Sequence, residues 1–534
     1  MPRTAAYVRC FDSHKLSGRC SVKKITSLVF TAVLLLAVTG IVFAGGRREA
    51  VSEDTVSVMV YERGWAPAER GTMDDNDWLD WIREDSGLDI RMVPVPRWEV
   101  REVLNTQFAA GTAPDIINDF SRDTVANFQA QGVLAPLDDW IEQYSTSLRQ
   151  YLADNPHLDP YLRFGENNEM YAVTTMRSQD SISGHLMWIR KDWLDNVGLD
   201  VPTTEEEFFA VADAFVNQDP NGTGQNDTFA FAADHAYMPI IEALYAVYSR
   251  EWYVDDTGVI SEARTQERLV DFFTFHQLAN ERGWVDPELV TDSERQRQRQ
   301  LWVTGRAGIH FSGVNPPHYQ ELLANVPGAQ LQPLGPFETR HGRFGLLQEP
   351  PAERFVALNR NIANPRAAIE YLDWLVDEGW FTLRFGFEGQ HHEMVDGVPR
   401  TLLTGDQHNE QLRYAWDYIL LQQWQLQTEW LPVLAADDPM SQEIARMRGE
   451  AIETQLAVTF RRDTPFRPTM QEILNFNDEF APVFNDIMVE VQLGTVSPRE
   501  AYQQAVSEWS RLGGESVQRI VQGWYNENRE AWGR

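Results

Sequence analysis

The sequence predicts an α/β protein of two lobes whose second half is rich in helices. Strand and helix patterns alternate near the N-terminus, helical patterns dominate further on, and the chain has 534 residues. A single hydrophobic core stops growing at about 250–300 residues, so a chain of this length is expected to divide into two lobes of ordinary size.

The first elements are expected to form a parallel sheet. Strand, helix, strand, helix, strand is the pattern of a parallel sheet covered by helices. Ligands of such sheets bind beyond the carboxyl ends of the strands, here the loops after Tyr61 and Ile117. The expected elements are a strand at 55–61, a helix at 78–82 that ends near Gly87, a strand at 88–95, a helix at 99–110 that ends at Gly111, and a strand at 115–117.

The rest of the chain shows mainly the 3.6-residue periodicity of helices. Helices are predicted at 205–217, 262–282, 367–380, 411–424 and over most of 440–534. Glu205, Glu206 and Glu207 follow Thr203 and Thr204, and acidic residues in the first turn after a threonine N-cap stabilise a helix.

The N-terminal segment has the pattern of a cleaved export signal. Lys23 and Lys24 precede an apolar run that ends in Val42-Phe43-Ala44, where small residues stand at the last and third-last positions. We therefore predict a signal peptide at 1–44 and a short flexible segment at 45–54. A retained membrane anchor is the alternative, because a run of about 20 apolar residues can span a bilayer. No cysteine follows the cleavage position, so a lipid anchor is not expected and the mature protein should be free in the periplasm.

Composition excludes several classes of function. Both cysteines, Cys10 and Cys20, precede the predicted cleavage position, so the mature chain has no disulfide, thiolate metal site or cysteine nucleophile. The whole chain carries a net charge of −33, which disfavours nucleic acid as a partner. Lys191, the only lysine after residue 24, does not follow a glycine, so the chain has no nucleotide-binding P-loop.

One loop after the helix at 205–217 predicts a calcium site with a structural role. Oxygen-bearing side chains stand at alternating positions of the loop, with Gly224 at position 6 for the sharp turn, and hard oxygen ligands in such an arrangement suit Ca²⁺. Position 12 is Ala230 instead of glutamate, so the loop is not an EF-hand, and an ordinary turn is the alternative. The candidate ligands are Asp219, Asn221, Thr223, Gln225, Asp227 and the adjacent Thr228.

Several segments in this order resemble the family 1 extracellular solute-binding proteins of bacterial ABC importers, in the long subgroup of LipO-like and alginate-oligosaccharide-binding proteins. They are Asn76-Asp77-Trp78 with residues 81–87, Ala109-Ala110-Gly111 with Pro114-Asp115-Ile116, residues 131–138, Trp188-Ile189-Arg190-Lys191-Asp192-Trp193-Leu194 with residues 197–204, and Phe385-Gly386-Phe387-Glu388 with residues 389–397. Alginate-oligosaccharide binders carry a similar calcium loop with an acid where this chain has Thr228.

The resemblance implies a two-lobed, type II periplasmic-binding-protein fold with ligand in a cleft between the lobes. It implies no catalysis: the monomeric receptor delivers a sugar or oligosaccharide to the membrane permease of an ABC transporter. By analogy, the chain crosses between the lobes near 175–185, 308–313 and 386–390. The N-terminal lobe is then expected at 55–178 and 313–386, and the C-terminal lobe at 179–312 and 387–534.

Aromatic content agrees with a carbohydrate ligand, since the chain has 18 tryptophans, all after residue 44. The flat C–H faces of pyranose rings stack on indole, while sugar hydroxyls bind carboxylates, amides and guanidinium groups. The candidate residues follow a predicted strand, lie in one of the motifs that resemble the family, or stand at an expected crossing between the lobes. The candidate ligand-binding residues are Trp65, Asp119, Arg177, Trp188, Asn315, Glu388 and His391.

Two other functions remain open from the sequence. A binding protein for a non-sugar polar solute, such as a peptide, has the same general features. A secreted polysaccharide-degrading enzyme needs an acid–base pair of carboxylates, which the acidic chain could supply although no pair stands out.

Overall fold

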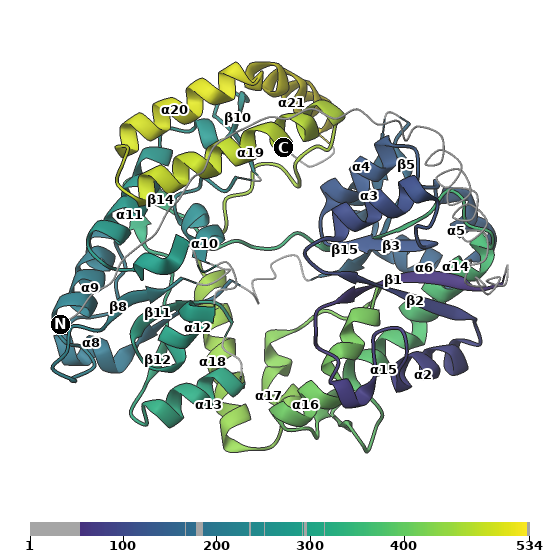
Figure 1. The fold of residues 1–534 in the computed structure, drawn as a ribbon, viewed down its shortest axis with the longest axis horizontal. Coiled ribbons are helices and arrows are strands. Elements are labelled where there is room, and N and C mark those ends of the chain that lie inside the picture. The colour runs from purple at the N-terminus through teal and green to yellow at the C-terminus, as the bar shows by residue number, and fades with distance from the viewer. Residues whose placement is uncertain are drawn as a thin grey trace, which may run out of the picture. The chain divides into compact units, whose positions relative to one another are not determined.

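The computed structural model describes residues 54–530, apart from residues 166, 178–184, 234–236, 250, 291, 293–295 and 314–315 (Figure 1). The predicted signal peptide at 1–44, both cysteines and Asn315 lie outside the described residues. The protein is an α/β protein built on two separate sheets, as the sequence predicts.

The first sheet has five strands in the order β2-β1-β3-β15-β6. β1 pairs in parallel with β2 and β3, whereas β15 runs antiparallel to β3 and β6. The predicted alternation of three strands and two helices is therefore confirmed. The strands are β1 (Val56–Glu62), β2 (Ile90–Pro96), β3 (Ile116–Asp119), β6 (Val173–Met176) and β15 (Ala352–Leu358).

The two helices between these strands end at the predicted glycines, and the first of them begins at a side-chain cap. The side chain of Asn76 accepts hydrogen bonds from the backbone of Trp78 and Leu79 and so starts α2 (Asp77–Ser86). Gly87 and Gly111 follow α2 and α3 (Val100–Ala110) with φ of 67°, a left-handed conformation that suits glycine at a helix end.

The first lobe contains further helices and hairpins, most of which pack on the same hydrophobic core. They include α4 (Arg122–Ala130), α5 (Asp138–Tyr144), α6 (Ser147–Asp154), α7 (Asp159–Leu162), α14 (Pro365–Trp374), α15 (Trp380–Phe385), α16 (Gly405–Gln411) and the hairpins β4 (Arg163–Phe164) with β5 (Glu169–Met170) and β16 (His392–Val395) with β17 (Val398–Thr401).

The second sheet has the order β12-β7-β11-β8, where β11 is parallel to β8 and antiparallel to β7. Its strands are β7 (Met187–Arg190), β8 (Phe229–Ala232), β11 (Ala307–Phe311) and β12 (Leu331–Pro333). The nearby helices are α8 (Lys191–Val197), α9 (Glu205–Asn217), α10 (Tyr237–Leu244), α11 (Leu269–Glu281), α12 (Gln296–Val303) and α13 (Pro316–Asn325), and two hairpins are β9 (Trp252–Val254) with β10 (Ile260–Glu262) and β13 (Glu338–Thr339) with β14 (Gly342–Arg343).

The C-terminal part is helical, as predicted, and lies mainly on the second lobe (Figure 1). Its helices are α17 (Leu431–Leu434), α18 (Pro439–Leu456), α19 (Gln471–Gln492), α20 (Pro498–Arg511) and α21 (Gly514–Asn528). Among the described helices, none combines the length and apolarity that a membrane span requires.

The predicted second and third crossings are placed wrongly. β11 belongs wholly to the second sheet, and the chain enters the first sheet only at β15, so the second crossing lies at 344–351 and not at 308–313. After β15, buried residues as far as Leu421 pack in the core of the first lobe, whereas Leu426 packs in the second lobe. The third crossing therefore lies at 422–425 and not at 386–390. The first crossing follows Met176 and ends before Met187, within the region expected for it.

The predicted helix at 411–424 is also wrong. A 3-10 segment covers Arg413–Tyr418, and residues without helix or strand structure follow it. The carbonyl groups that an α-helix would use bind other partners: those of Asp417 and Ile419 accept from Arg354, and that of Leu420 accepts from Thr175. Tertiary hydrogen bonds therefore replace the helical ones.

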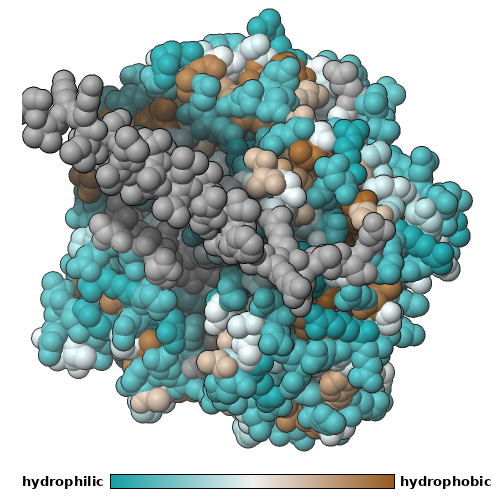
Figure 2. Space-filling view, turned by 45° about the vertical axis from the view of Figure 1, so that its right-hand side comes forward, coloured by the Kyte–Doolittle hydropathy of each residue, from teal (hydrophilic) through white to brown (hydrophobic). Residues whose placement is uncertain are grey.

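The face of the molecule in Figure 2 is mostly hydrophilic, and its hydrophobic residues form small, separate patches. This agrees with the acidic composition of the chain.

Candidate functional site

The carboxyl edge of the first sheet gathers positively charged side chains. Arg63 directly follows β1, and Arg97 directly follows β2. β15 runs in the opposite direction, so Arg354, near its start, lies at the same edge. Parallel strands thus bring together residues that are far apart in the sequence, at the edge where such sheets bind ligands.

These three arginines surround two stacked aromatic rings. Tyr61 and Phe120 lie 5.6 Å apart with an interplanar angle of 13°. The guanidinium carbons of Arg63, Arg97 and Arg354 lie 5.0, 4.7 and 4.9 Å from the centre of the Tyr61 ring. Each also lies within 6 Å of the Phe120 ring. The negative faces of the rings stabilise the neighbouring cations.

Two carboxylates partly balance the cations. Asp417 pairs with Arg63 at 2.9 Å, and Asp119, the last residue of β3, lies 3.9 Å from Arg97. Burial raises the pKa of Asp417 above its usual value, although Arg354 and Arg63 act in the opposite direction. The site is therefore a partly desolvated cluster in which each charge depends on its neighbours.

Arg354 is the structural centre of the cluster. Its guanidinium donates to the side chain of Asn118 at 2.8 Å and to the carbonyls of Ile419 and Asp417 at 2.7 and 3.0 Å. Burial lowers its pKa from the usual arginine value. Because each of its three guanidinium nitrogens already donates to a protein oxygen, Arg354 holds the site together and is less available to a ligand than its neighbours.

Two tryptophans lie at the border of the cluster. The half-buried indole of Trp65 lies 4.7 Å from the guanidinium of Arg63 and 4.3 Å from that of Arg413. Trp98 is 86% exposed, the largest exposed fraction of any large hydrophobic residue described, and lies 5.0 Å from Arg97. An exposed indole beside hydrogen-bonding groups provides a surface on which a sugar ring can stack.

The structure thus brings two of the predicted residues, Trp65 and Asp119, into one site. Arg177 follows β6 and forms ion pairs with Glu349, at 3.3 Å, and with Glu353. Its backbone N–H donates to Pro351 at 2.8 Å, so it joins the first and second crossings.

Glu388 and His391 lie elsewhere in the first lobe, in the turn before β16. Glu388 is exposed, whereas His391 is 9% exposed and accepts a hydrogen bond from the backbone of Phe387 at 3.0 Å. The His391 ring packs against Trp78 and Phe387, and burial lowers its pKa. These contacts favour a packing role for His391.

Trp188 also has a packing role. It has no exposed surface, and its indole N–H donates to the carbonyl of Ser312 at 2.8 Å within the core of the second lobe. This position does not favour the predicted ligand contact.

The sequence interpretation missed Arg63, Arg97 and Trp98. All three follow strand ends, the same signal that singled out Trp65 and Asp119. Arg354 carries no local signal, because its place in the cluster depends on the antiparallel entry of β15 into the sheet.

The predicted calcium loop joins α9 to β8. Both carboxylate oxygens of Asp219 accept backbone N–H groups, from Thr223 at 3.0 Å and Gly224 at 2.9 Å, and the side chain of Asn221 lies 3.2 Å from Asp227. Within the described residues, no group of three or more His, Cys, Asp or Glu side chains could hold a metal, and this loop supplies two carboxylates plus neutral oxygens.

Two features of the loop bear on its fit to calcium. The structure does not place Thr228 among the predicted ligands. Its buried hydroxyl donates to the carbonyl of Phe215 at 2.8 Å, away from the loop. Arg306 lies 3.6 Å from the carboxylate of Asp227 and partly neutralises it. The side-chain oxygens of Asp219 and Asn221 both accept the backbone N–H of Thr223, and the amide nitrogen of Asn221 faces Asp227.

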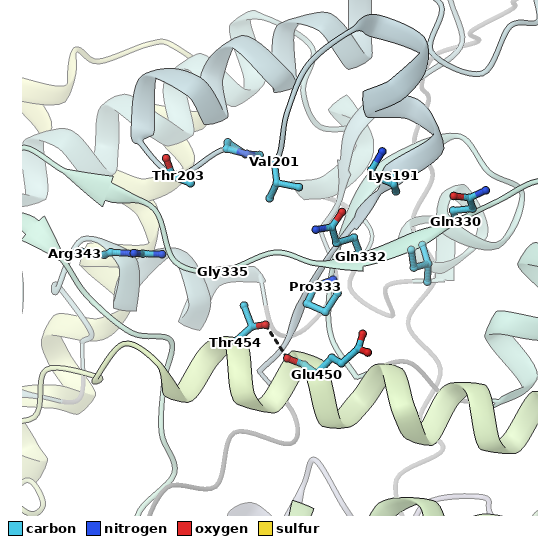
Figure 3. Close-up of a pocket in the computed structure, with 12 residues that line it drawn as sticks. Lys191, Val201, Thr203, Gln330, Gln332, Pro333, Gly335, Arg343, Glu450 and Thr454 are labelled. Carbon is cyan, nitrogen blue, oxygen red and sulfur yellow. Dashed lines mark hydrogen bonds between the residues drawn. The ribbon is translucent and has the colours of Figure 1, made fainter.

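A cavity lies on the second lobe, away from the arginine cluster. It measures about 570 Å³ and is bounded by α8, the edge strand β12 and α18 (Figure 3). Lys191, Gln332 and Glu450 supply polar groups, but none of its described lining residues is aromatic. It therefore lacks the stacking surface that a sugar ring requires.

Comparison with curated proteins identifies several relatives. The polygalacturonan/rhamnogalacturonan-binding protein YtcQ of Bacillus subtilis is 28% identical over 42% of this chain and 44% of its own length. Lipoprotein LipO of the same organism is 24% identical over 68% of this chain and 72% of its own length. The fructooligosaccharide-transporter substrate-binding protein FusA of Streptococcus pneumoniae is 32% identical over 24% of this chain and 26% of its own length. The matches to YtcQ and FusA thus span less than half of those proteins.

Solved structures share the fold over most of the chain. S. pneumoniae FusA bound to kestose has a TM-score of 0.67 at 16% identity and covers 89% of this chain and 100% of its own. The alginate-binding protein AlgQ2 without calcium has a TM-score of 0.68 at 16% identity and covers 89% of this chain and 99% of its own. The two-lobed architecture is therefore that of the solute-binding proteins. The chain also matches the family described as bacterial extracellular solute-binding protein over residues 76–380, more than half of its length, and so belongs to that family.

Proposed function

We propose that this protein is the solute-binding receptor of an ABC importer and that its ligand is an oligosaccharide. The observation that carries the proposal is the pair of tryptophans, Trp65 and Trp98, beside guanidinium and carboxylate groups at the carboxyl edge of the first sheet. The family is one of binding proteins, and relatives named for oligosaccharides support this ligand class. The protein acts as a monomer that closes its two lobes on the ligand and delivers it to the membrane permease.

The chemistry of the site suits recognition without reaction. Aromatic faces bind the apolar C–H surface of a sugar, and charged groups bind its hydroxyls. Asp119 and Asp417 are both engaged with arginines, which makes them hydrogen-bond acceptors held in place rather than a free acid and base.

The test is a panel of oligosaccharides measured by tryptophan fluorescence and calorimetry, with product analysis of the same samples. We expect saturable quenching with the sugar recovered intact. Appearance of shortened products would indicate a polysaccharide-degrading enzyme. Absence of binding across the panel, combined with binding of peptides or other polar solutes, would overturn the sugar assignment.

We also propose that Asp219, Asn221, Thr223, Gln225 and Asp227 bind a structural Ca²⁺ ion. A ligand that binds only the folded state stabilises it by RT ln(1 + [L]/Kd), about 2.7 kcal/mol at 100 times Kd. Calcium should therefore raise the Tm, and a chelator should lower it.

The control for this calcium test separates the loop from general ionic effects. Asp219→Asn with Asp227→Asn should abolish the response to calcium, while Asp200→Asn, at an exposed position in the same lobe, should retain it. A Tm that calcium leaves unchanged in the parent protein would show that the loop is an ordinary turn.

Export to the periplasm without a lipid anchor completes the proposal, since the predicted signal peptide ends at Ala44 and no cysteine follows it. N-terminal sequencing of the exported protein should begin at Gly45. A chain that retains residues 25–44 in the membrane fraction would favour the anchored alternative.

A further inference from the structure

The arginine cluster is a local reversal of the charge of the chain. The whole protein carries −33, yet among the described residues the four guanidinium groups of Arg63, Arg97, Arg354 and Arg413 form ion pairs with two carboxylates, those of Asp119 and Asp417. Glu62 lies on the opposite face of β1 from Tyr61, because neighbouring residues of a strand point to opposite sides, and its carboxylate accepts the backbone N–H of Gly64 at 2.6 Å.

The excess of positive charge is costly without an anion. The side chains of Arg63 and Arg97 are only 19% and 18% exposed, so water solvates them poorly. Burial and the nearby Arg63 lower the pKa of Arg413, which is the effect expected of cations placed close together. A negatively charged ligand would offset this repulsion.

Within the described part of the chain, the guanidinium of Arg97 donates no hydrogen bond to a protein oxygen. Its Nε is buried and has no hydrogen-bond partner within the described residues, and its ion pair with Asp119 is long, at 3.9 Å. By contrast, Arg63 pairs with Asp417 at 2.9 Å, and Arg354 donates to three oxygens. Arg97 therefore keeps donors for a ligand, and the exposed indole of Trp98 adjoins it.

We propose that the ligand is an acidic oligosaccharide, with an anionic group bound by Arg97 and the ring that carries it stacked on Trp98. This inference rests on the proposed function and adds the charge of the ligand to it. A uronic acid carboxylate is planar and accepts the two parallel N–H groups of a guanidinium fork. A sulfate ester offers similar oxygens, so the shared chemistry is an anionic sugar.

The test compares sugars that differ only in charge. Oligosaccharides of galacturonic, glucuronic, mannuronic and guluronic acid are titrated into the full-length mature protein by calorimetry, each beside its counterpart with the carboxyl groups reduced to hydroxymethyl. A sulfated series forms the third arm. We expect at least one acidic sugar to bind at least about tenfold more tightly than its neutral counterpart, with an affinity that falls as salt rises.

Substitutions then assign the effect to the cluster. Arg97→Gln should weaken the acidic sugar at least about tenfold and leave its reduced counterpart nearly unchanged, whereas Arg97→Lys, which keeps the charge but not the fork, should retain part of the affinity. Trp98→Ala should weaken both sugars. Arg91→Gln, an exposed position in the same strand β2, is the matched control and should change neither.

The outcomes separate this inference from the proposed function. Binding of neutral sugars with no preference for acidic ones would overturn the charge assignment and leave the sugar receptor intact. Equal weakening of both sugars by Arg97→Gln would also overturn it. Preference for sulfated sugars alone would support the anionic class and identify sulfate as its source. If Arg97→Gln does not fold, the salt dependence of the parent protein decides between the charged and uncharged ligand. Absence of binding by every sugar would remove both proposals.

Discussion

At the scale of single residues, His276 on α11 makes the free energy of unfolding depend on pH. It is 2% exposed among aromatic side chains, its Nδ1 lies 3.4 Å from the hydroxyl of Tyr237, and its Nε2 has no described partner. Burial lowers its pKa to about 3, so the folded protein keeps the ring neutral. The unfolded chain takes up a proton near pH 6.5, and the stability present above that pH is lost as pH falls from 6.5 towards 3.

The expected loss from His276 is about 2 kcal/mol between pH 6.5 and pH 5, since one proton contributes about 1.36 kcal/mol per pH unit. Denaturant unfolding at pH 7.5 and pH 5.0 measures it. His276→Gln should show a smaller difference between the two pH values by about that amount, while the exposed His157→Gln should behave like the parent protein. An unchanged pH dependence in His276→Gln would assign the acid sensitivity to other groups.

The tryptophans show which roles of single residues can be predicted from the sequence and which cannot. Trp65 could be predicted because it follows a strand end, and the same reasoning applies to Trp98 after β2, where the predicted strand stopped at Val95 and the next helix began at Glu99. Trp188 could not be assigned, because both faces of β7 are buried and alternation along it carries no information about exposure. The role of a charged residue depends on which groups it pairs with, as Arg97 and Arg354 illustrate. These partners lie on strands that are distant in the sequence.

At the scale of elements, the start of α9 is stabilised by a capping box, which forms at the threonine N-cap that the sequence predicts. The hydroxyl of Thr204 accepts the backbone N–H of Glu207 at 3.2 Å, and the Glu207 carboxylate accepts the N–H of Thr204 at 3.2 Å. Thr203 adds two more hydrogen bonds to the same carboxylate. The helix ends in the loop predicted to bind calcium.

Thr204→Ala should cost about 1 kcal/mol of unfolding free energy, because it leaves helix N–H groups without an acceptor. Denaturant unfolding followed by circular dichroism measures the change. Thr106→Ala, in the exposed interior of α3, is the control, and we expect it to be neutral or slightly stabilising because alanine is the better helix former. A loss in Thr106→Ala as large as that in Thr204→Ala would show that capping is not the cause.

The elements of the first lobe follow local patterns closely, whereas their connections do not. β1, α2, β2, α3 and β3 appear where alternation and glycine positions indicate. The second and third crossings could not be predicted, because lobe membership depends on which sheet edge a strand joins. β11 and β15 are both short buried strands, yet they enter different sheets. The segment at 411–424 shows the same limit, since Arg354 and Thr175 take the carbonyls that a helix would use.

At the scale of the whole molecule, each lobe has a core of its own, and few chain segments join them. The first sheet packs in one hydrophobic cluster and the second sheet in others, with crossings after Met176 and at 344–351 and 422–425. These crossings lie together: Arg177 donates to Pro351, and Gln425 lies 3.0 Å from the sulfur of Met176. Rotation about such a bundle of connections can move the lobes without disturbing either core.

The C-terminal segment adds a second link between the lobes. Arg467 pairs with Asp123, the hydroxyl of Thr469 accepts from Arg122 at 2.7 Å, and Arg101 pairs with Asp478 at 2.7 Å, although α19 packs mainly on the second lobe. The Arg101–Asp478 pair is about half exposed and contributes little to stability. A motion of the lobes about a hinge near α4 and α19 would preserve these contacts. Any other motion of the lobes must break only weak contacts, such as the exposed Arg101–Asp478 pair.

Ligand binding should make the protein more compact in solution. Small-angle scattering at saturating ligand is expected to show a smaller radius of gyration than the free protein, because closure around the ligand is the motion that two separate cores and clustered crossings allow. Trp98→Ala at the same ligand concentration provides the control, since weaker binding should leave a larger fraction of molecules in the ligand-free form. A scattering profile that the bound ligand does not change, with binding verified by calorimetry in the same sample, would show that the lobes do not close and that recognition takes place on the first lobe alone.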